Sequence, residues 1–153
     1  MHPRRDGHPN FKYPYDRLLP LHGTITEEVM RDPNMLDHDN KICLFVIKSA
    51  GTTGVTIGRA TGPFSFVRHD LSSQGSKMWA IYNYDNKDKI FSACGDSGSV
   101  IADGLGRIFG LLTGGAGKTE TPDVTYATPM WWLLPRIQKY FPNAHLSPAA
   151  AKN

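Results

Sequence analysis

Apolar residues gather in short stretches from residue 41 onward. Residues 41–49 (KICLFVIKS) form an apolar run bounded by lysines, which predicts a buried strand. Six further strands are predicted at 54–60 (GVTIGRA), 63–68 (PFSFVR), 77–84 (KMWAIYNY), 98–103 (GSVIAD), 106–113 (GRIFGLLT) and 123–128 (DVTYAT). Turns are expected between them, at Gly62-Pro63, at 85–89 (DNKDK) and at 103–106 (DGLG). Short strands separated by such turns are typical of an antiparallel barrel or sandwich.

A helix is predicted after the last strand, because apolar residues then recur at helical spacing. Thr128 is the expected cap and Pro129 the first helical residue, and Leu133, Ile137, Tyr140 and Phe141 would form the apolar face. Pro135 should kink the helix or restart it. Trp131 and Trp132 are interpreted as packing residues.

Residues 1–40 have a different character. They hold five of the eleven prolines and four of the six histidines, without a long alternating run. Residues 24–33 (TITEEVMRDP) predict a short helix capped by Thr24 or Thr26 and ended by Pro33. The predicted organisation is an extended arm (1–40), an antiparallel all-β unit, either a barrel or a sandwich, with a terminal helix (41–145), and a tail (146–153).

Composition narrows the function classes. The net charge is +3, and residues 1–40 hold five Lys/Arg against seven Asp/Glu, so no basic arm for nucleic acid is expected. No apolar run is long enough for a membrane span, and the first residues lack the apolar core of a secretory signal. Either a cytoplasmic location or a piece of a longer chain is expected. Cys43 and Cys94 are interpreted as two thiols in a reducing compartment.

Residues 93–99 (ACGDSGS) carry the main chemical signal. Two glycines bracket an Asp-Ser pair directly before a strand. Such a turn can aim the backbone amides of Gly95 and Ser97 at one point, where they would stabilise an oxyanion. A serine hydroxyl becomes a good nucleophile only when a base removes its proton. The turn therefore predicts a nucleophile, Ser97, that needs a base from elsewhere.

Three stretches carry a family resemblance: 48–58 (KSAGTTGVTIG), 93–115 (ACGDSGSVIADGLGRIFGLLTGG) and 123–137 (DVTYATPMWWLLPRI). Together they resemble the second barrel of the chymotrypsin-like serine peptidases. The resemblance is closest to the bacterial-type branch, in which a Ser-Gly-x-Thr-Thr-Gly stretch opens that barrel. The chain is also similar to trypsin-like proteins of mushroom-forming fungi. The match covers about residues 41–145 and implies a chymotrypsin-like barrel.

The resemblance implies roles for individual residues. Ser97 aligns with the nucleophile, Gly95 with the oxyanion donor, and Asp96 with the residue whose ion pair orders the turn. The stretch Leu112-Thr113-Gly114-Gly115 aligns with the edge strand that binds the substrate backbone. Phe91 aligns with the floor of the specificity pocket, which implies a shallow apolar site without trypsin-like preference.

The chain differs from the family in the residues that would supply the catalytic base. In that family the histidine and its orienting aspartate come from a first barrel, earlier in the chain, and 47 residues before Lys48 are too few for one. His22, His38 and His69 have settings unlike that of the family histidine. Because triads occur in several chain orders, one of these three beside Ser97 is an alternative source of the base. One hypothesis is a serine-peptidase-like domain, inactive alone and completed by a separate first barrel. The alternative is a non-catalytic module that binds a protein, or dimerises, through the exposed half-barrel face.

Two other patterns, a glycine-rich loop and the spacing of the histidines, do not predict a binding site. Residues 114–119 (GGAGKT) look like a phosphate loop, but Leu112 replaces the required glycine and Pro122 opposes a helix. The histidines lack metal-ligand spacing, so neither metal nor cofactor is expected.

Overall fold

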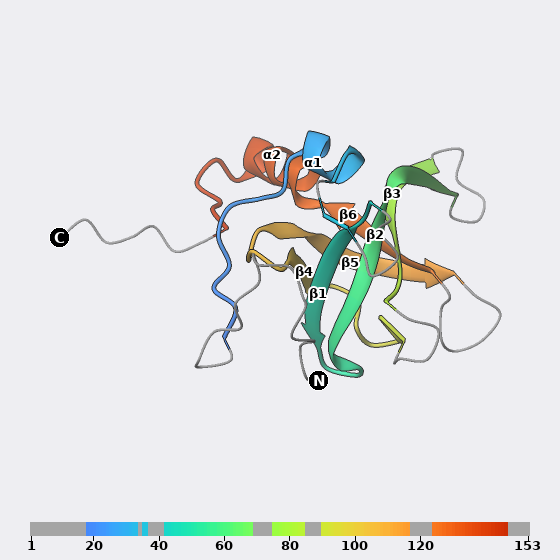
Figure 1. Cartoon of the computed structure of the whole chain (residues 1–153). Coiled ribbons are helices and arrows are strands. Elements are labelled where there is room, and N and C mark those ends of the chain that lie inside the picture. Colours follow the sequence, from blue (N-terminus) through green and yellow to red (C-terminus); the bar gives the residue numbers. More distant parts are fainter. Residues whose placement is uncertain are drawn as a thin grey trace.

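Six antiparallel strands close into a barrel in the computed structural model, which describes residues 18–33, 35–36, 42–68, 75–84, 90–116 and 124–146. The strand order around the barrel is β1-β2-β3-β6-β5-β4 (Figure 1). The strands are β1 (Leu44–Ala50), β2 (Gly54–Arg68), β3 (Gly75–Asn83), β4 (Val100–Asp103), β5 (Ile108–Ala116) and β6 (Val124–Pro129). Helix α1 (Glu27–Arg31) precedes them and α2 (Met130–Tyr140) follows. The predicted single antiparallel β-barrel with a C-terminal helix is confirmed.

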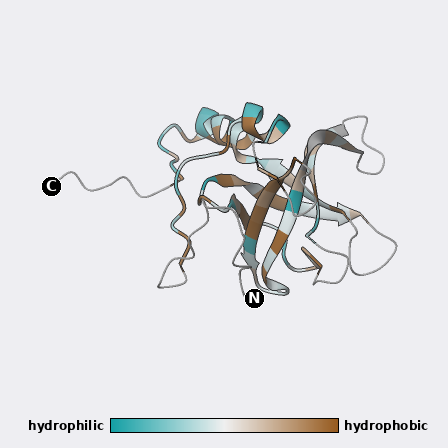
Figure 2. Ribbon diagram, in the orientation of Figure 1, coloured by the Kyte–Doolittle hydropathy of each residue, from teal (hydrophilic) through white to brown (hydrophobic). Residues whose placement is uncertain are grey.

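The barrel interior is filled by alternate residues of its strands. Burial alternates along β1 and β6, as expected when one face of a strand points inward. Trp79 lies at the centre of the core, with edge-on ring contacts to Phe64 and Phe109 at centroid distances of 4.3 and 6.2 Å. Figure 2 shows the hydrophobic stretch along β1 and the hydrophilic residues on the two helices.

The strand prediction was wrong in one region. The segments 54–60 and 63–68 form one continuous strand, β2, rather than two strands around a Gly62-Pro63 turn. The pairing of β2 with β3 shifts register between Ala60 and Phe64. An irregularity of this kind lets a long strand bend around a small barrel without ending it. The predicted 85–89 turn lies outside the described residues.

The N-terminal arm joins the barrel core. The amide of Ile25 donates to the carbonyl of Ile108 over 3.0 Å, and the amide of Ile108 donates to the carbonyl of Gly23 over 3.1 Å. The arm passes so close to the β4–β5 hairpin that a Cβ on Gly106 would lie 2.2 Å from the Pro20 carbonyl oxygen. Ile25 and Met30 are 0% and 1% exposed and belong to the core cluster. The described residues 18–33 of the arm are therefore a structural part of the domain.

The two helices lie against each other on one side of the barrel (Figure 1). The indole Nε1 of Trp131 in α2 contacts Met30 Sδ of α1 at 3.3 Å. The predicted short helix is confirmed as α1, with the Thr26 hydroxyl accepting from the amide of Val29 at 3.4 Å. It ends at Arg31, two residues before Pro33.

The predicted start of the terminal helix was off by one residue. β6 runs through Pro129, which is itself the N-cap and makes no side-chain capping bond, so Thr128 is not the cap. Strand pairing explains this, because Pro129 lies opposite Gly110 of β5 and Thr128 opposite Leu111. α2 also runs through Pro135 without restarting. Within the described ranges, no helix combines the length and the apolar character that a membrane crossing requires.

We predict that the arm contributes measurably to stability. Met30→Ala should lower the free energy of unfolding by about 2–5 kcal/mol, because it leaves a cavity between α1, α2 and the barrel. Leu18→Ala should change it by no more than about 0.5 kcal/mol, since Leu18 is 68% exposed. Urea unfolding followed by tryptophan fluorescence measures both. Equal effects of the two substitutions would contradict the docking of the arm.

Candidate functional site

The turn that contains Ser97 connects Phe91 to the start of β4. Ser97 is exposed, whereas its neighbour Asp96 is completely buried. Gly95 and Gly98 have φ angles of 97° and 84°, in the left-handed region that L side chains rarely adopt. The chain therefore reverses direction on both sides of the Asp-Ser pair, turning one side chain inward and the other outward.

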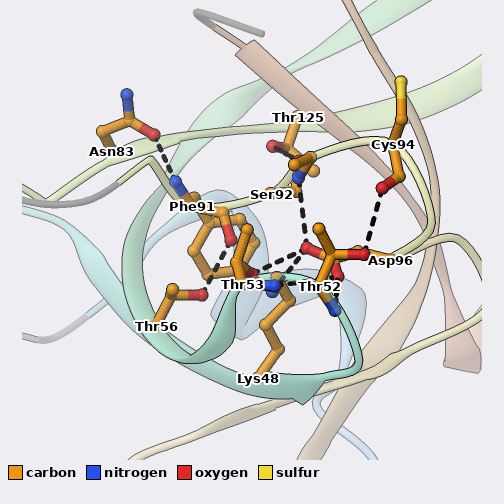
Figure 3. A network of polar contacts seen from close by, with 11 residues as sticks. Lys48, Thr52, Thr53, Thr56, Asn83, Phe91, Ser92, Cys94, Asp96 and Thr125 are labelled. Carbon is orange, nitrogen blue, oxygen red and sulfur yellow. Dashed lines mark hydrogen bonds and ion pairs between the residues drawn. The ribbon is translucent and has the colours of Figure 1, made fainter. Parts of the chain in front are cut away.

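Asp96 is held by donors from three segments (Figure 3). Its Oδ2 accepts from Lys48 Nζ at 3.1 Å, Thr53 Oγ1 at 2.7 Å and the Ala93 amide at 3.1 Å. Its Oδ1 accepts from the amides of Thr52 and Thr53 at 3.0 and 3.3 Å. Both side chains of the Lys48–Asp96 pair are 0% exposed. The carboxylate thus joins the Ser97 turn to the end of β1 and the β1–β2 turn.

These contacts determine the charge of Asp96. Burial alone would raise the pKa of its carboxyl. The hydrogen bonds from Thr53, Ala93, Lys48 and Thr52 outweigh burial and hold the pKa well below its ordinary value. Asp96 is therefore a carboxylate at neutral pH, and it acts as a structural anion rather than a proton carrier.

Lys48 is the residue that sequence reasoning missed. We interpreted it as the polar boundary of a buried strand, whereas it lies inside the barrel with its Nζ also donating to Thr53 Oγ1 at 2.6 Å. Strand periodicity could have found it, because Leu44, Val46 and Lys48 alternate along β1 and all three are buried. An inward lysine requires a buried anion. Asp96 is that anion.

Three side chains anchor the segment that leads into the turn. Asn83 Oδ1 accepts from the Phe91 amide and Thr56 Oγ1 donates to the Phe91 carbonyl, both at 2.7 Å. The hydroxyls of Ser92 and Thr125 are 2.6 Å apart, and both residues are buried. Strands β2 and β6, together with the last residue of β3, therefore fix the chain just before the turn begins.

Two backbone amides of the turn differ from their neighbours in their hydrogen bonding. The amides of Asp96, Gly98 and Ser99 donate to the carbonyls of Ala93, Leu112 and Asp96. Within the described part of the chain, the amides of Gly95 and Ser97 donate to no protein group. Both donors belong to exposed residues. They are the two amides that the sequence assigned to an oxyanion.

Ser97 itself has no base beside it among the described residues. Its hydroxyl makes no hydrogen bond to any of them, and therefore none to His22 or His145. His22 lies at the β4–β5 hairpin, where its amide donates to the Gly106 carbonyl over 2.9 Å. His38 and His69 lie outside the described residues. A triad built on His22 receives no support from this geometry.

The predicted substrate-binding strand lies directly beside the turn. The Gly98 amide donates to the Leu112 carbonyl over 2.7 Å, and the Leu112 amide donates to the Ser99 carbonyl over 3.0 Å. Beyond Leu112, β5 continues to Ala116 with Gly114 and Gly115 paired to β6 only. Thr113 lies at a register shift, exposed, with its hydroxyl 2.8 Å from that of Thr128. The described structure therefore leaves one edge of 113–116 unpaired.

Phe91 lies in the barrel core. It is completely buried, and Gly58 makes room for its ring, since a Cβ on Gly58 would lie 2.7 Å from Phe91 Cδ2. Lys48 Nζ is 5.5 Å from the ring centroid, a favourable cation–π distance. A substrate would reach Phe91 only if the surrounding side chains moved, so its position is that of a packing residue. Its role as a pocket floor stays a prediction.

Other reactive groups are placed apart from one another. Cys43 is buried and Cys94 exposed, and no disulfide joins them. In Figure 3 the Cys94 thiol points away from Asp96. Over the described ranges, no three His, Cys, Asp or Glu side chains gather as a metal site would require.

We predict that the buried pair is strongly coupled. Asp96→Asn should cost about 3–5 kcal/mol of stability, because it leaves Lys48 buried without a counter-ion. Adding Lys48→Met to that variant should recover part of the loss, giving a coupling energy of about 0.5–3 kcal/mol in a double-mutant cycle. Asp103→Asn, which removes another buried carboxylate paired with Arg107, is the control. It should not change amide exchange at 95–97.

We also predict the pH range in which Asp96 stabilises the fold. Its folded pKa is lowered, so its contribution is complete above the unfolded pKa of about 4 and is lost as pH falls toward the folded pKa. The loss should reach about 1.4 kcal/mol per pH unit below pH 4. Asp96→Asn should show a shallower acid limb in urea titrations at pH 2.5–6. Identical acid limbs would refute this assignment.

The chain was compared with known proteins. No protein-family model matches it. No curated protein matches it either.

Proposed function

We propose that the chain is a serine-peptidase-like domain in which the 95–97 turn serves acyl transfer from a peptide. Ser97 is the nucleophile, and the Gly95 and Ser97 amides stabilise the oxyanion formed when its hydroxyl attacks a peptide carbonyl. The proposal rests on one observation. These two amides belong to exposed residues and make no hydrogen bond within the described structure, while the buried Asp96 fixes the turn between them.

Rigidity of the turn supports the proposal. A donor stabilises a developing charge best when it is already oriented before the reaction, because no free energy is then spent on ordering it. Five donors hold the Asp96 carboxylate. Removing a single oxyanion donor typically costs about 10²–10³ in rate. A buried ion pair is a physical means of preserving such donors.

The proposed reaction requires a base that the described residues do not provide. Without a base the hydroxyl keeps its proton and attacks slowly. Enzymes that lose a member of the triad keep about 10³–10⁴ of acceleration over water from the oxyanion donors and binding. We therefore expect weak activity from the chain alone, and full activity only when a histidine from elsewhere, such as a separate first barrel, reaches Ser97.

The alternative is a module that binds a protein without catalysis. The absence of a described partner for the Ser97 hydroxyl favours it. Exposed large apolar side chains are found on the arm (Leu18, Leu21), β2 (Val55, Phe66), β4 (Val100), the β4–β5 hairpin (Leu105) and the end of α2 (Tyr140, Phe141). Because they come from several different elements, they do not by themselves define one association face. A homodimer stays a prediction.

Chemical rescue tests the catalytic proposal. A fluorophosphonate probe should label the chain slowly, and added imidazole should accelerate labelling by supplying the missing base. Ser97→Ala should abolish labelling, whereas Ser99→Ala, a serine two residues away, should not. Intact-mass spectrometry reads out the adduct. Labelling that persists in Ser97→Ala, or that ignores imidazole, would contradict the proposal.

A further inference from the structure

We infer that one face of α2, together with the end of that helix, docks the protein on an anionic lipid bilayer. This α2 surface consists of Trp132, Arg136, Lys139, Tyr140 and Phe141. The inference goes beyond the proposed function and does not depend on the chemistry of the serine turn. The occupant is the headgroup region of a membrane that contains acidic phospholipids, and the protein lies on that membrane without crossing it.

The first step concerns the helix face. Counted from Trp132, the surface residues within α2 are spaced i, i+4, i+7 and i+8, which places them on one side of a helix with 3.6 residues per turn. Arg136 and Lys139 are exposed, Tyr140 is 76% exposed and Trp132 is half-buried. The contact with α1 is made by Trp131, which lies about 100° around the helix from Trp132. The neighbouring helix therefore contacts a different side of α2.

The second step concerns the end of the helix, which is held in place. The Phe141 amide donates to the Ile137 carbonyl over 2.8 Å, and the Ala144 amide donates to the Phe141 carbonyl over 2.9 Å. Nε2 of Gln138 donates to the Ala144 carbonyl at 3.1 Å. The ring of Phe141 is nevertheless 69% exposed, directly after an exposed tyrosine. Two aromatic rings are thus presented from a fixed backbone, and both gain free energy on leaving water.

The third step concerns charge, which identifies the occupant as an anion. All 14 Asp and Glu residues of the chain lie within residues 1–123, so the sequence 124–153 contains none. The α2 surface carries Arg136 and Lys139. The Arg136 guanidinium lies 3.6 Å from the centroid of the Trp132 ring, and its Nη1 donates to the Trp132 carbonyl at 2.8 Å. A two-fold dimer through this surface would place these cations against their own copies, which disfavours self-association.

The glutamates of the neighbouring helix do not offset this positive charge by pairing with α2. Glu27 pairs with Arg31 of its own helix. The carboxylate of Glu28 is engaged by its own backbone amide and by the Thr26 side chain. Both glutamates of α1 are thus held within the first helix or at its cap, and the cations of α2 remain available to an external anion.

The combination of aromatic rings and cations favours a bilayer over other anions. Trp and Tyr concentrate where hydrocarbon meets the headgroups, and Lys and Arg at that level reach the phosphates. Phe141 has no polar group, so its ring gains most from an apolar partner. Two cations contribute little to nucleic-acid binding, whose affinity grows with the number of phosphates neutralised. Near an acidic membrane, each basic residue contributes about fivefold in affinity.

Vesicle flotation with the whole chain tests the inference. Vesicles of phosphatidylcholine that contain about one third phosphatidylserine should bind the chain about tenfold or more tightly than vesicles of phosphatidylcholine alone. Salt at about 1 M, where the screening length is about 3 Å, should abolish the difference. Equal binding to both vesicles, or binding to neither, would overturn the inference. Tighter binding to a single-stranded oligonucleotide or to polyglutamate would assign the surface to another partner and overturn it as well.

Charge variants locate the docking surface. Arg136→Gln and Lys139→Gln should each weaken binding to the acidic vesicles about fivefold, and together about 25-fold. Val55→Glu lowers the net charge by the same amount as either single variant, at a position that is 60% exposed. It lies beside the β1–β2 connection, at the end of the barrel opposite the two helices (Figure 1), and should leave binding unchanged. A similar loss from Val55→Glu would show that net charge, not this surface, directs binding, and would refute the proposal.

Aromatic variants test insertion into the bilayer. Replacing Tyr140 and Phe141 together by serine should weaken binding about tenfold or more, because two rings no longer leave water. Brominated lipids should quench the tryptophan fluorescence of the bound chain, and Trp132→Phe should remove most of that quenching. Urea unfolding midpoints close to that of the natural chain would show that the variants are folded. Full binding by the serine double variant, or quenching that persists in Trp132→Phe, would contradict the assigned orientation.

Ser97→Ala separates this inference from the proposed function. The variant should lose probe labelling and bind acidic vesicles as the natural chain does, since the serine turn is not part of the α2 surface. Loss of vesicle binding in Ser97→Ala would contradict docking through α2. Failure of probe labelling in the natural chain, with vesicle binding intact, would refute acyl transfer and leave the docking surface supported.

Discussion

The Lys48–Asp96 ion pair is the constraint on which the candidate site depends. A buried lysine and a buried aspartate each cost several kcal/mol of desolvation, which their mutual attraction offsets only when other hydrogen bonds are also made. Here Thr52, Thr53 and Ala93 supply those bonds. The arrangement is an expensive way to stabilise a barrel, since apolar residues of similar volume would serve as well or better. It is an effective way to hold one turn in one conformation.

The outward position of Ser97 is linked to the buried Lys48–Asp96 ion pair. Because the Asp96 side chain points inward, its neighbour Ser97 points outward, and the left-handed glycines on either side keep the chain in that path. Among the described residues, the amides of Gly95 and Ser97 then have no acceptor, while those of Asp96, Gly98 and Ser99 are paired. Donors left in this way are the ones that the proposed acyl transfer requires.

The sequence predicted the positions of the strands more accurately than the connections between them. Alternation and turn residues located all the strand segments, because burial on one face of a barrel strand enforces a period of two. The same signals did not reveal that β2 passes through Gly62-Pro63, because glycine and proline occur both in turns and at register shifts within a long strand.

The serine turn could be predicted from the sequence, because Gly95, Asp96 and Ser97 are neighbours in the chain. The partner of Asp96 could not, because Lys48 is 48 residues away and only the closed barrel brings the two together. The packing of Phe91 against Gly58 was hidden for the same reason.

The ladder between β1 and β4 has a consequence for how the domain folds. It closes the barrel with three residue pairs, Val46↔Asp103, Ile47↔Ala102 and Lys48↔Ile101. Lys48 thus contributes its backbone to the pairing of β1 with β4 and its ammonium group to the serine turn. Such distant pairings form late, after the entropy of closing long loops has been overcome. Closure of the barrel and anchoring of the serine turn therefore share one residue, so a change that weakens the β1–β4 pairing at Lys48 should also loosen the turn.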